Sequence, residues 1–190
     1  FLAIIAAFTP TLATFGIISG ILQRNLFDFR PALWNDQTYY WHQILTFSHA
    51  GFNGGYYMFY ERLPRLSFFH FGASGFLYPA LYGTAARVLG WEPYTGILLN
   101  MALIAISVLV LIRFAQFDRL QIVLTALLLV AIAPVLLYVP TISQESFHQA
   151  AALILGALFF HLFNRNGNVS RRFVVIGILF FILISLIRFS

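Results

Sequence analysis

The chain has 190 residues, of which 61% are hydrophobic and 9% are charged. Globular domains are roughly 45–50% apolar and about 25% charged, so this sequence has too little polar surface to cover a compact body in water. The eleven basic residues are all arginines and outnumber the six acidic ones. They are scattered between apolar runs and form no basic stripe along a phosphate backbone, which excludes nucleic-acid binding. The absence of cysteine excludes disulfide frameworks and thiolate metal sites.

Uncharged runs predict an all-α integral membrane fold. A helix needs about 20 apolar residues to cross the hydrocarbon core, and residues 1–23 contain no charge. Both ends of the sequence lie in apolar runs, so we expect residues 1–190 to form a single transmembrane domain that is a piece of a longer chain. The four later candidate spans are 94–112, 120–138, 146–163 and 173–187.

The stretch 24–93 between the first two runs has a different character. It holds seven of the nine tyrosines, and Tyr and Trp favour the headgroup level of a membrane. We therefore expect an aromatic-rich loop of several short interfacial helices.

Arginine placement predicts the orientation, since short loops rich in Arg face the cytoplasm. The loops 113–119 and 164–172 carry five arginines between them, whereas 139–145 carries none. We therefore place the loop 139–145 outside.

The segment 74–90 decides whether Asp36 and Glu145 share a side of the membrane. If it crosses, the chain has six spans and the two acids lie on opposite sides. If it lies at the interface, the chain has five spans and 24–93 is one external loop. We prefer the second arrangement, because the segment has only 17 residues and contains Pro79 and Arg87.

The densest polar cluster is WNDQTYYWH, residues 34–42. Surrounding rings raise the pKa of a carboxylate and a nearby cation lowers it, so Asp36 is a candidate general base or metal ligand. The alternative is a helix cap, because Asn and Asp are favoured at N-caps.

A second cluster combines Arg62, Arg65 and His70. Arginine offers a rigid bidentate fork to phosphate, so these side chains could bind a phosphate group. The same arginines could equally anchor the loop to anionic lipid headgroups.

A third cluster contains Glu145 and His148, which are three residues apart and thus on one face of a helix. An ionisable residue at the mouth of a span indicates function. The alternatives are a favourable contact of Glu145 with the helix dipole and a hydrogen bond from His148 to another helix. For Asn100 and His161, which lie inside apolar runs, we expect hydrogen bonds between helices.

The order of these parts resembles the N-terminal half of the polytopic GT-C glycosyltransferases, which include protein mannosyltransferases and lipid A aminoarabinose transferases. In that class an essential acid follows the first helix closely, and Asp36 in NDQTYYWHQ matches it. A His- and Gly-containing turn before a Leu-Tyr-Pro helix is matched by HFGASGFLYPALYGTAARVLG, residues 70–90. Many members have Asp-Glu where this chain has Asn35-Asp36, which is a departure from the pattern.

The resemblance implies transfer of a sugar from a polyprenyl-phosphate donor to a lipid, glycan or protein acceptor at the external face. We expect a multi-pass protein of the bacterial inner membrane that serves the cell envelope, and a eukaryotic reticulum membrane would also satisfy the topology. The resemblance implies Asp36 as general base and Glu145 as the second acid, with both as candidate ligands of a divalent cation, Mg²⁺ or Mn²⁺. The implied substrate-binding residues are Arg62, Arg65 and His70 for the phosphate, His148 on the facing helix, and Tyr39, Tyr40 and Trp41 for stacking on sugar rings.

Two other functions remain open on the sequence. A transporter or flippase for a lipid-linked substrate would use Asp36, Glu145 and His148 to relay protons or bind an ion, although its polar residues are typically near the membrane midplane. A non-enzymatic assembly subunit would use the aromatic loop to dock a partner, and such a loop would tolerate neutralisation of Asp36.

Overall fold

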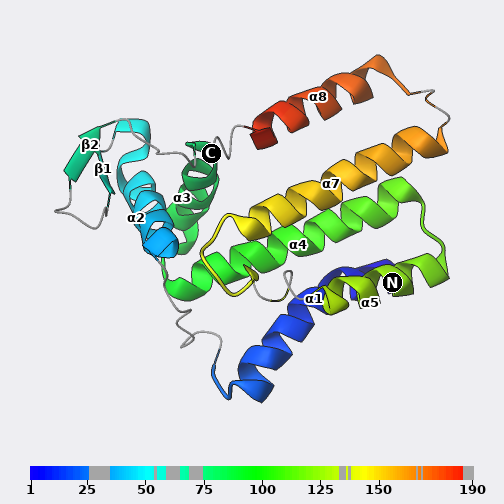
Figure 1. The fold of residues 1–190 in the computed structure, drawn as a ribbon, viewed down its shortest axis with the longest axis horizontal. Helices are drawn as coiled ribbons and strands as arrows, with labels where there is room; N and C mark the ends of the chain where they lie inside the picture. The colour runs from blue at the N-terminus through cyan, green and yellow to red at the C-terminus, as the bar shows by residue number, and fades with distance from the viewer. Residues whose placement is uncertain are drawn as a thin grey trace.

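The computed structural model describes residues 1–25, 35–53, 55–58, 65–68, 75–132, 136, 138–165, 167 and 169–185. For residues 35, 36, 53, 55–58 and 65–68 the description covers the backbone alone. Across these ranges the fold is helical apart from one two-stranded sheet (Figure 1). The helical elements are α1 (Leu2–Gly16), the π-helical turn η1 (Ile17–Ile21), α2 (Asn35–Ala50), the 3₁₀ turn η2 (Gly51–Asn53), α3 (Leu77–Leu89), α4 (Pro93–Ala115), α5 (Arg119–Ala131), α7 (Glu145–Asn164) and α8 (Arg171–Ser185).

Three described helices are long and apolar enough to cross a membrane: α1 with η1, α4 and α7. We expected five or six spans, and the described helices α5 and α8 have 13 and 15 residues. At 1.5 Å per residue, α5 is about 20 Å long, which is less than the roughly 30 Å of the hydrocarbon core. A proline at position 134 disfavours helix just before it and lacks an N–H, so counting apolar residues overestimated this helix.

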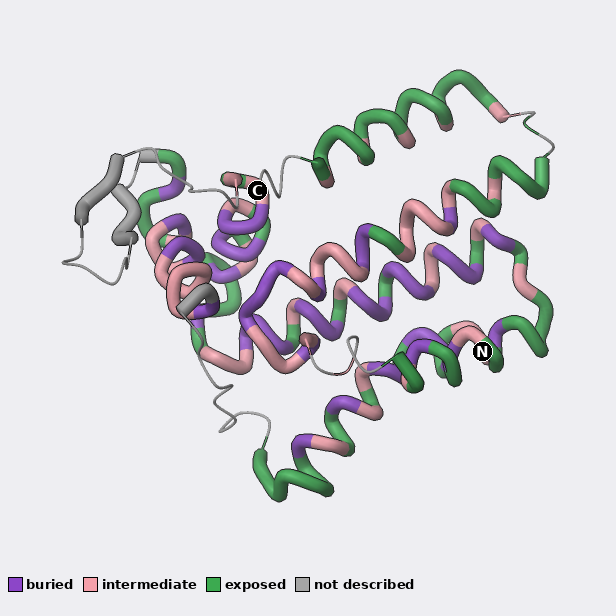
Figure 2. The backbone as a smooth tube through the Cα atoms, viewed as in Figure 1, coloured by how far each residue is buried: buried purple, intermediate pink, exposed green. Residues whose placement is uncertain are grey.

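Helix α4 is the centre of the bundle, with α7 on one side and α1 on the other (Figures 1 and 2). On its inner face Ile97, Ile104 and Val108 are fully buried, and the neighbouring helices contribute the small residues Ala7 and Ala150. Small residues let helix backbones approach closely, which is how membrane helices associate.

Local sequence sets where the central helices begin. Glu92 and Thr95 form a reciprocal capping box at the start of α4, where Pro93 occupies the first turn. Asp118 and Gln121 form a second capping box at the start of α5, with the Gln121 N–H donating to Asp118 Oδ1 at 2.8 Å. Both boxes satisfy backbone N–H groups that a helix start leaves without partners.

Successive helices of the bundle run in opposite directions. Helices α4 and α7 are therefore parallel to each other, and α5 and α8 are antiparallel to them (Figure 1). The turns after α4 and α7, which carry the arginines of 113–119 and 164–172, therefore lie at one end of the bundle. The residues leading into α7 lie at the other end, together with α2 and α3.

The stretch 24–93 is only partly as we expected. It contains the short helices α2 and α3, but strands β1 (Gly55–Met58) and β2 (Arg65–Phe68) pair antiparallel, with Gly55 opposite Phe68. Helix α3 has 13 residues, about 20 Å, so it is too short to cross the core. This length favours an interfacial helix over a sixth span.

Candidate functional site

Helices α2 and α3 pack as a close pair at the end of the bundle opposite the arginine-rich turns. A Cβ built on Gly83 of α3 would lie 2.7 Å from Phe47 Cδ1 and 3.1 Å from the Ile44 carbonyl oxygen of α2. Only glycine permits this approach.

Arg87 ties the C-terminal end of α2 to α3. Its Nε donates to the Ser48 carbonyl oxygen at 2.8 Å and its Nη2 to the Phe47 carbonyl oxygen at 3.2 Å. The guanidinium carbon also lies 5.8 Å from the centre of the Phe47 ring. A cation here satisfies carbonyls that the end of a helix leaves without partners, and it complements the helix dipole.

An aromatic layer connects this pair with the start of α4. The Tyr40 ring meets the Tyr78 ring edge-on, with centroids 5.5 Å apart. The Trp41 ring lies against the Trp91 ring at 4.9 Å. Tyr40 and Trp41, which we proposed as sugar-stacking residues, thus have one part of each ring in contact with the protein, and both side chains remain partly exposed.

Asn100 is the centre of a buried hydrogen-bond network. Its Oδ1 accepts from the Tyr82 hydroxyl at 2.5 Å, and its Nδ2 donates to the carbonyl oxygens of Val139 and Thr141 at 3.0 and 2.7 Å. Helices α3 and α4 and the segment that precedes α7 are joined at this one side chain. The expected role of Asn100 in hydrogen bonding between elements is confirmed.

A second buried bond reaches the same segment. The Tyr78 hydroxyl donates to the Ser143 carbonyl oxygen at 3.3 Å, and the Ser143 and Thr141 hydroxyls lie 2.6 Å apart. Two tyrosines of α3 therefore hold the turn that leads into Glu145. Tyr82 acts through Asn100, and Tyr78 bonds directly to Ser143. Tertiary contacts fix where α7 begins.

Glu145 opens α7 at this point. Its Oε2 is buried and has no hydrogen-bond partner among the described residues. Burial raises the pKa of Tyr78 well above its ordinary value, chiefly by desolvation, with the charge of Glu145 among the smaller causes. Because the Tyr78 hydroxyl bonds to Ser143, two residues before Glu145, this carboxylate lies close to that end of α3 in the fold, with an acceptor oxygen unused.

Further buried polar atoms lie on the elements that meet here. Gln37 Oε1, Trp91 Nε1 and Ser146 Oγ are buried without a partner among the described residues. A buried polar atom without a hydrogen bond is costly, and natural proteins retain few of them. Their presence on α2, at the start of α4 and at the start of α7 is typical of a site that completes its hydrogen bonds with a ligand.

His148 is bound within its own helix. Its Nδ1 lies 3.0 Å from the Gln144 carbonyl oxygen, one turn earlier. We had considered a hydrogen bond from His148 to another helix, and among the described residues no such bond is found. Because a carbonyl oxygen only accepts, Nδ1 is the donor of this bond.

His161 also differs from expectation. Its ring packs against the rings of Phe114 and Phe173, at 5.3 and 4.7 Å between centroids. Among the described residues, His161 thus joins α7 to α4 and α8 through ring contacts, and the hydrogen bond between α7 and α4 at this end comes from Asn164, whose Nδ2 donates to the Ala115 carbonyl oxygen at 2.8 Å.

Several predicted site residues lie outside the described residues. Arg62 and His70 are among them, and the side chains of Asp36 and Arg65 are as well. The backbone places Asp36 in the first turn of α2, and Arg65 pairs with Met58 at one end of the sheet.

No group of three His, Asp or Glu side chains in the described part of the chain is arranged to hold a metal ion. The proposed cation ligands were Asp36 and Glu145, of which Glu145 offers one buried carboxylate oxygen. Oxygen ligands of this kind suit Mg²⁺ and Mn²⁺.

Sequence reasoning missed Tyr82 and Trp91 as parts of this end of the bundle. Tyr78 and Tyr82 are four residues apart on α3, which places both on one helix face. That spacing was the one signal in the sequence that could have placed Tyr82 beside Tyr78 in this site.

At this end of the bundle, the free Oε2 of Glu145 can accept a hydrogen bond. Comparison with family models, curated proteins and solved structures finds no match to this chain.

Proposed function

We propose that this chain is a membrane glycosyltransferase of the GT-C type, which moves a sugar from a polyprenyl-phosphate donor to a hydroxyl of a lipid, glycan or protein acceptor at the external face. The observation that carries the proposal is the buried, unpartnered Oε2 of Glu145 beside Tyr78, at the same end of the bundle as the start of α2.

The proposed topology has five spans: α1 with η1, α4, the run that begins with α5, α7 and the run that begins with α8. Residues 24–93 would form one external loop, and the arginine-rich turns would face the cytoplasm of a bacterial inner membrane. The alternating helix directions support this arrangement. Helices α3 and α5 have the same length, but the uncharged run of α5 continues in the sequence to residue 138, whereas α3 contains Arg87 and is followed by Glu92. A lipid-linked donor would then present its phosphosugar at the depth of α2 and α3.

In the proposed reaction, the acceptor oxygen attacks the anomeric carbon and forms the new glycosidic bond. The bond between that carbon and the phosphate oxygen breaks, and the polyprenyl phosphate leaves with the electron pair. Asp36 takes the proton of the attacking hydroxyl as general base. Glu145 accepts a hydrogen bond from a sugar or acceptor hydroxyl and orients it, with His148 one turn further along α7.

Arg62, Arg65 and His70 would hold the donor phosphate, and Tyr39, Tyr40 and Trp41 would offer their exposed ring parts to the sugar. Asp36 and Glu145 are also the residues that would hold a divalent cation. When bound, that cation would neutralise charge on the leaving phosphate.

The test is a transfer assay with the full chain in liposomes and a panel of polyprenyl-phosphate sugars. Asp36→Asn and Glu145→Gln should each reduce transfer by about 100-fold or more. The matched control is Asp118→Asn, because Asp118 is an acid at the opposite end of the bundle and Asn is also a good N-cap. Full transfer by the Asp36→Asn variant would contradict the proposal and favour a docking or transport role.

A further inference from the structure

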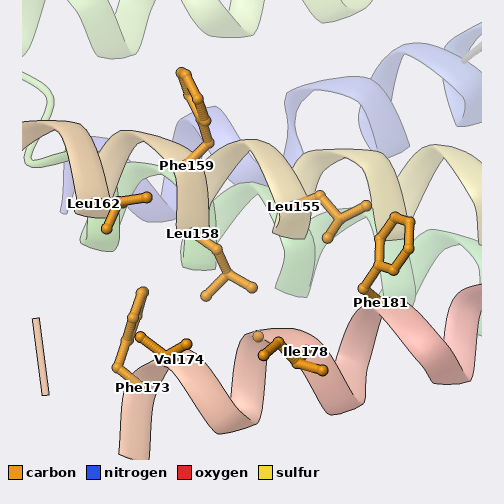
Figure 3. Close-up of a pocket in the computed structure, with 9 residues that line it drawn as sticks. Leu155, Leu158, Phe159, Leu162, Phe173, Val174, Ile178 and Phe181 are labelled. Carbon is orange, nitrogen blue, oxygen red and sulfur yellow. The ribbon is translucent and has the colours of Figure 1, made fainter. Parts of the chain in front are cut away.

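An apolar groove separates α7 from α8 (Figure 3). Leu158 and Leu162 on α7 and Phe173, Val174 and Ile178 on α8 are among the residues that line it, and its volume is about 300 Å³. The part of α8 that lines the groove spans residues 173–181, about 12 Å along the helix axis. The side chains drawn in Figure 3 are hydrocarbon throughout, so the groove suits a hydrocarbon chain.

The middle of this groove has free space at Gly177. A Cβ built there would meet only Leu158 Cδ1, at 3.9 Å. Helix α8 has no buried residue among those described, and Ile176 and Phe181 are 60% and 61% exposed. Figure 2 shows α8 exposed along nearly its whole length.

The groove begins at the arginine-rich end of the bundle. Arg171 and Arg172 are the first residues of α8 and directly precede Phe173, and Arg165 caps α7 three residues after Leu162. All three arginines are exposed. The loop 164–172 that joins the two helices contains no acidic residue, so this mouth of the groove is strongly positive.

We propose that the α7–α8 groove and its three arginines form a binding site for one anionic phospholipid. An acyl chain lies along the groove between Leu158 and Ile178, and the phosphate lies against Arg165, Arg171 and Arg172. Arginine binds phosphate oxygens through two parallel N–H donors, and each basic residue near a membrane surface favours anionic lipid. Charge at the mouth and hydrocarbon along the walls match the two halves of such a lipid.

This proposal goes beyond sugar transfer and requires only that the helices lie in a membrane. The site is at the end of the bundle opposite Glu145 (Figure 1), so loss of one site leaves the other intact. Lipid retention by the unaltered chain without any sugar transfer would contradict the proposed function alone.

The experiment is native mass spectrometry of the full chain, released from nanodiscs of phosphatidylglycerol or of phosphatidylcholine with the same acyl chains. We expect one phosphatidylglycerol retained per chain, with at least about tenfold preference over phosphatidylcholine. Arg171→Gln with Arg172→Gln should remove that preference. Arg24→Gln with Arg119→Gln, which removes the same charge from the segment after η1 and from the start of α5, should leave it unchanged.

Two substitutions at one position test the groove itself. Gly177→Phe fills the groove and should abolish retention, whereas Gly177→Ala leaves it open and should retain the lipid. Equal loss in both double-arginine variants would overturn the site in favour of a diffuse charge effect. Retention in Gly177→Phe, or a second copy of the chain in place of lipid, would also overturn it.

Discussion

The Tyr82 hydroxyl donates a hydrogen bond of 2.5 Å to Asn100 Oδ1, and both side chains are buried. The other end of the Asn100 amide donates to two carbonyls just before α7. These hydrogen bonds fix the start of α7, where Glu145 lies, relative to α3 and α4. Because Tyr82 and Val139 are buried and Thr141 is half-buried, loss of Asn100 leaves polar groups that water can replace poorly.

We expect Asn100→Ala to reduce the free energy of unfolding by about 2 kcal/mol or more, since it leaves a buried hydroxyl and two carbonyls unsatisfied. Ser107→Ala is the matched control. Ser107 is buried on the same helix, and its hydroxyl bonds only to the Leu103 carbonyl of that helix. Thermal unfolding in detergent measures both, and equal destabilisation would contradict a network centred on Asn100.

Tyr82→Phe tests the coupling directly. A double-mutant cycle of Tyr82→Phe with Asn100→Ala should give a coupling energy of about 0.5–3 kcal/mol, because the two side chains share one bond. Additive effects of the two substitutions would show that this bond contributes nothing to stability.

Gly83→Ala should separate α2 from α3. The new methyl group would lie 2.7 Å from Phe47 and 3.1 Å from a backbone oxygen of α2, and overpacking of this kind costs about 1–3 kcal/mol. Gly156→Ala on α7 is the control, because a Cβ there meets nothing within 4 Å. Hydrogen exchange of the α2 amides should rise in the first variant and stay unchanged in the second.

The free energy of unfolding should fall as the pH is lowered through the range in which the His42 ring takes up a proton. Partial burial on α2 lowers the pKa of this histidine below 6.5, so the folded protein holds the ring neutral while the unfolded chain takes up a proton near pH 6.5. Stability is therefore fully present above that value and is lost progressively below it, until the folded pKa is reached. We expect His42→Gln to flatten the melting temperature between pH 7.5 and 5. The exposed His49 supplies the control His49→Gln, and an unchanged slope in the His42 variant would contradict the assignment.

Glu145→Gln should leave the melting temperature unchanged or raise it. A buried carboxylate oxygen without a partner costs stability that a neutral amide would cost less. Natural proteins carry such strain at functional sites. A large loss of stability, measured by thermal unfolding beside Asp118→Asn, would instead identify Glu145 as a structural residue.

Much of the helical framework could be predicted from the sequence, because uncharged runs directly reflect the length of apolar helix. The expected spans 94–112 and 146–163 are helices Pro93–Ala115 and Glu145–Asn164 in the structure. The expected span 120–138 ends early at Ala131, since hydropathy alone ignored Pro134.

Contacts between distant residues could not be predicted in this way. The pairing of Tyr82 with Asn100 and of Arg87 with the end of α2 depends on how α3 packs, and a single sequence carries no signal for it. The β1–β2 sheet was missed because its tyrosines and arginines were interpreted as marks of interfacial helices. For the site, the position of Glu145 at the start of α7 could be predicted from the sequence, while its unpartnered oxygen required the fold.

The most direct test of the shared external site is the side of the membrane on which Asp36 and Glu145 lie. The chain has no cysteine, so single cysteines at positions 36, 145 and 118 can be labelled in intact cells with an impermeant maleimide and normalised to labelling after permeabilisation. We predict that positions 36 and 145 label from outside and that position 118 labels only after permeabilisation. Labelling of 36 and 145 from opposite sides would contradict a shared site.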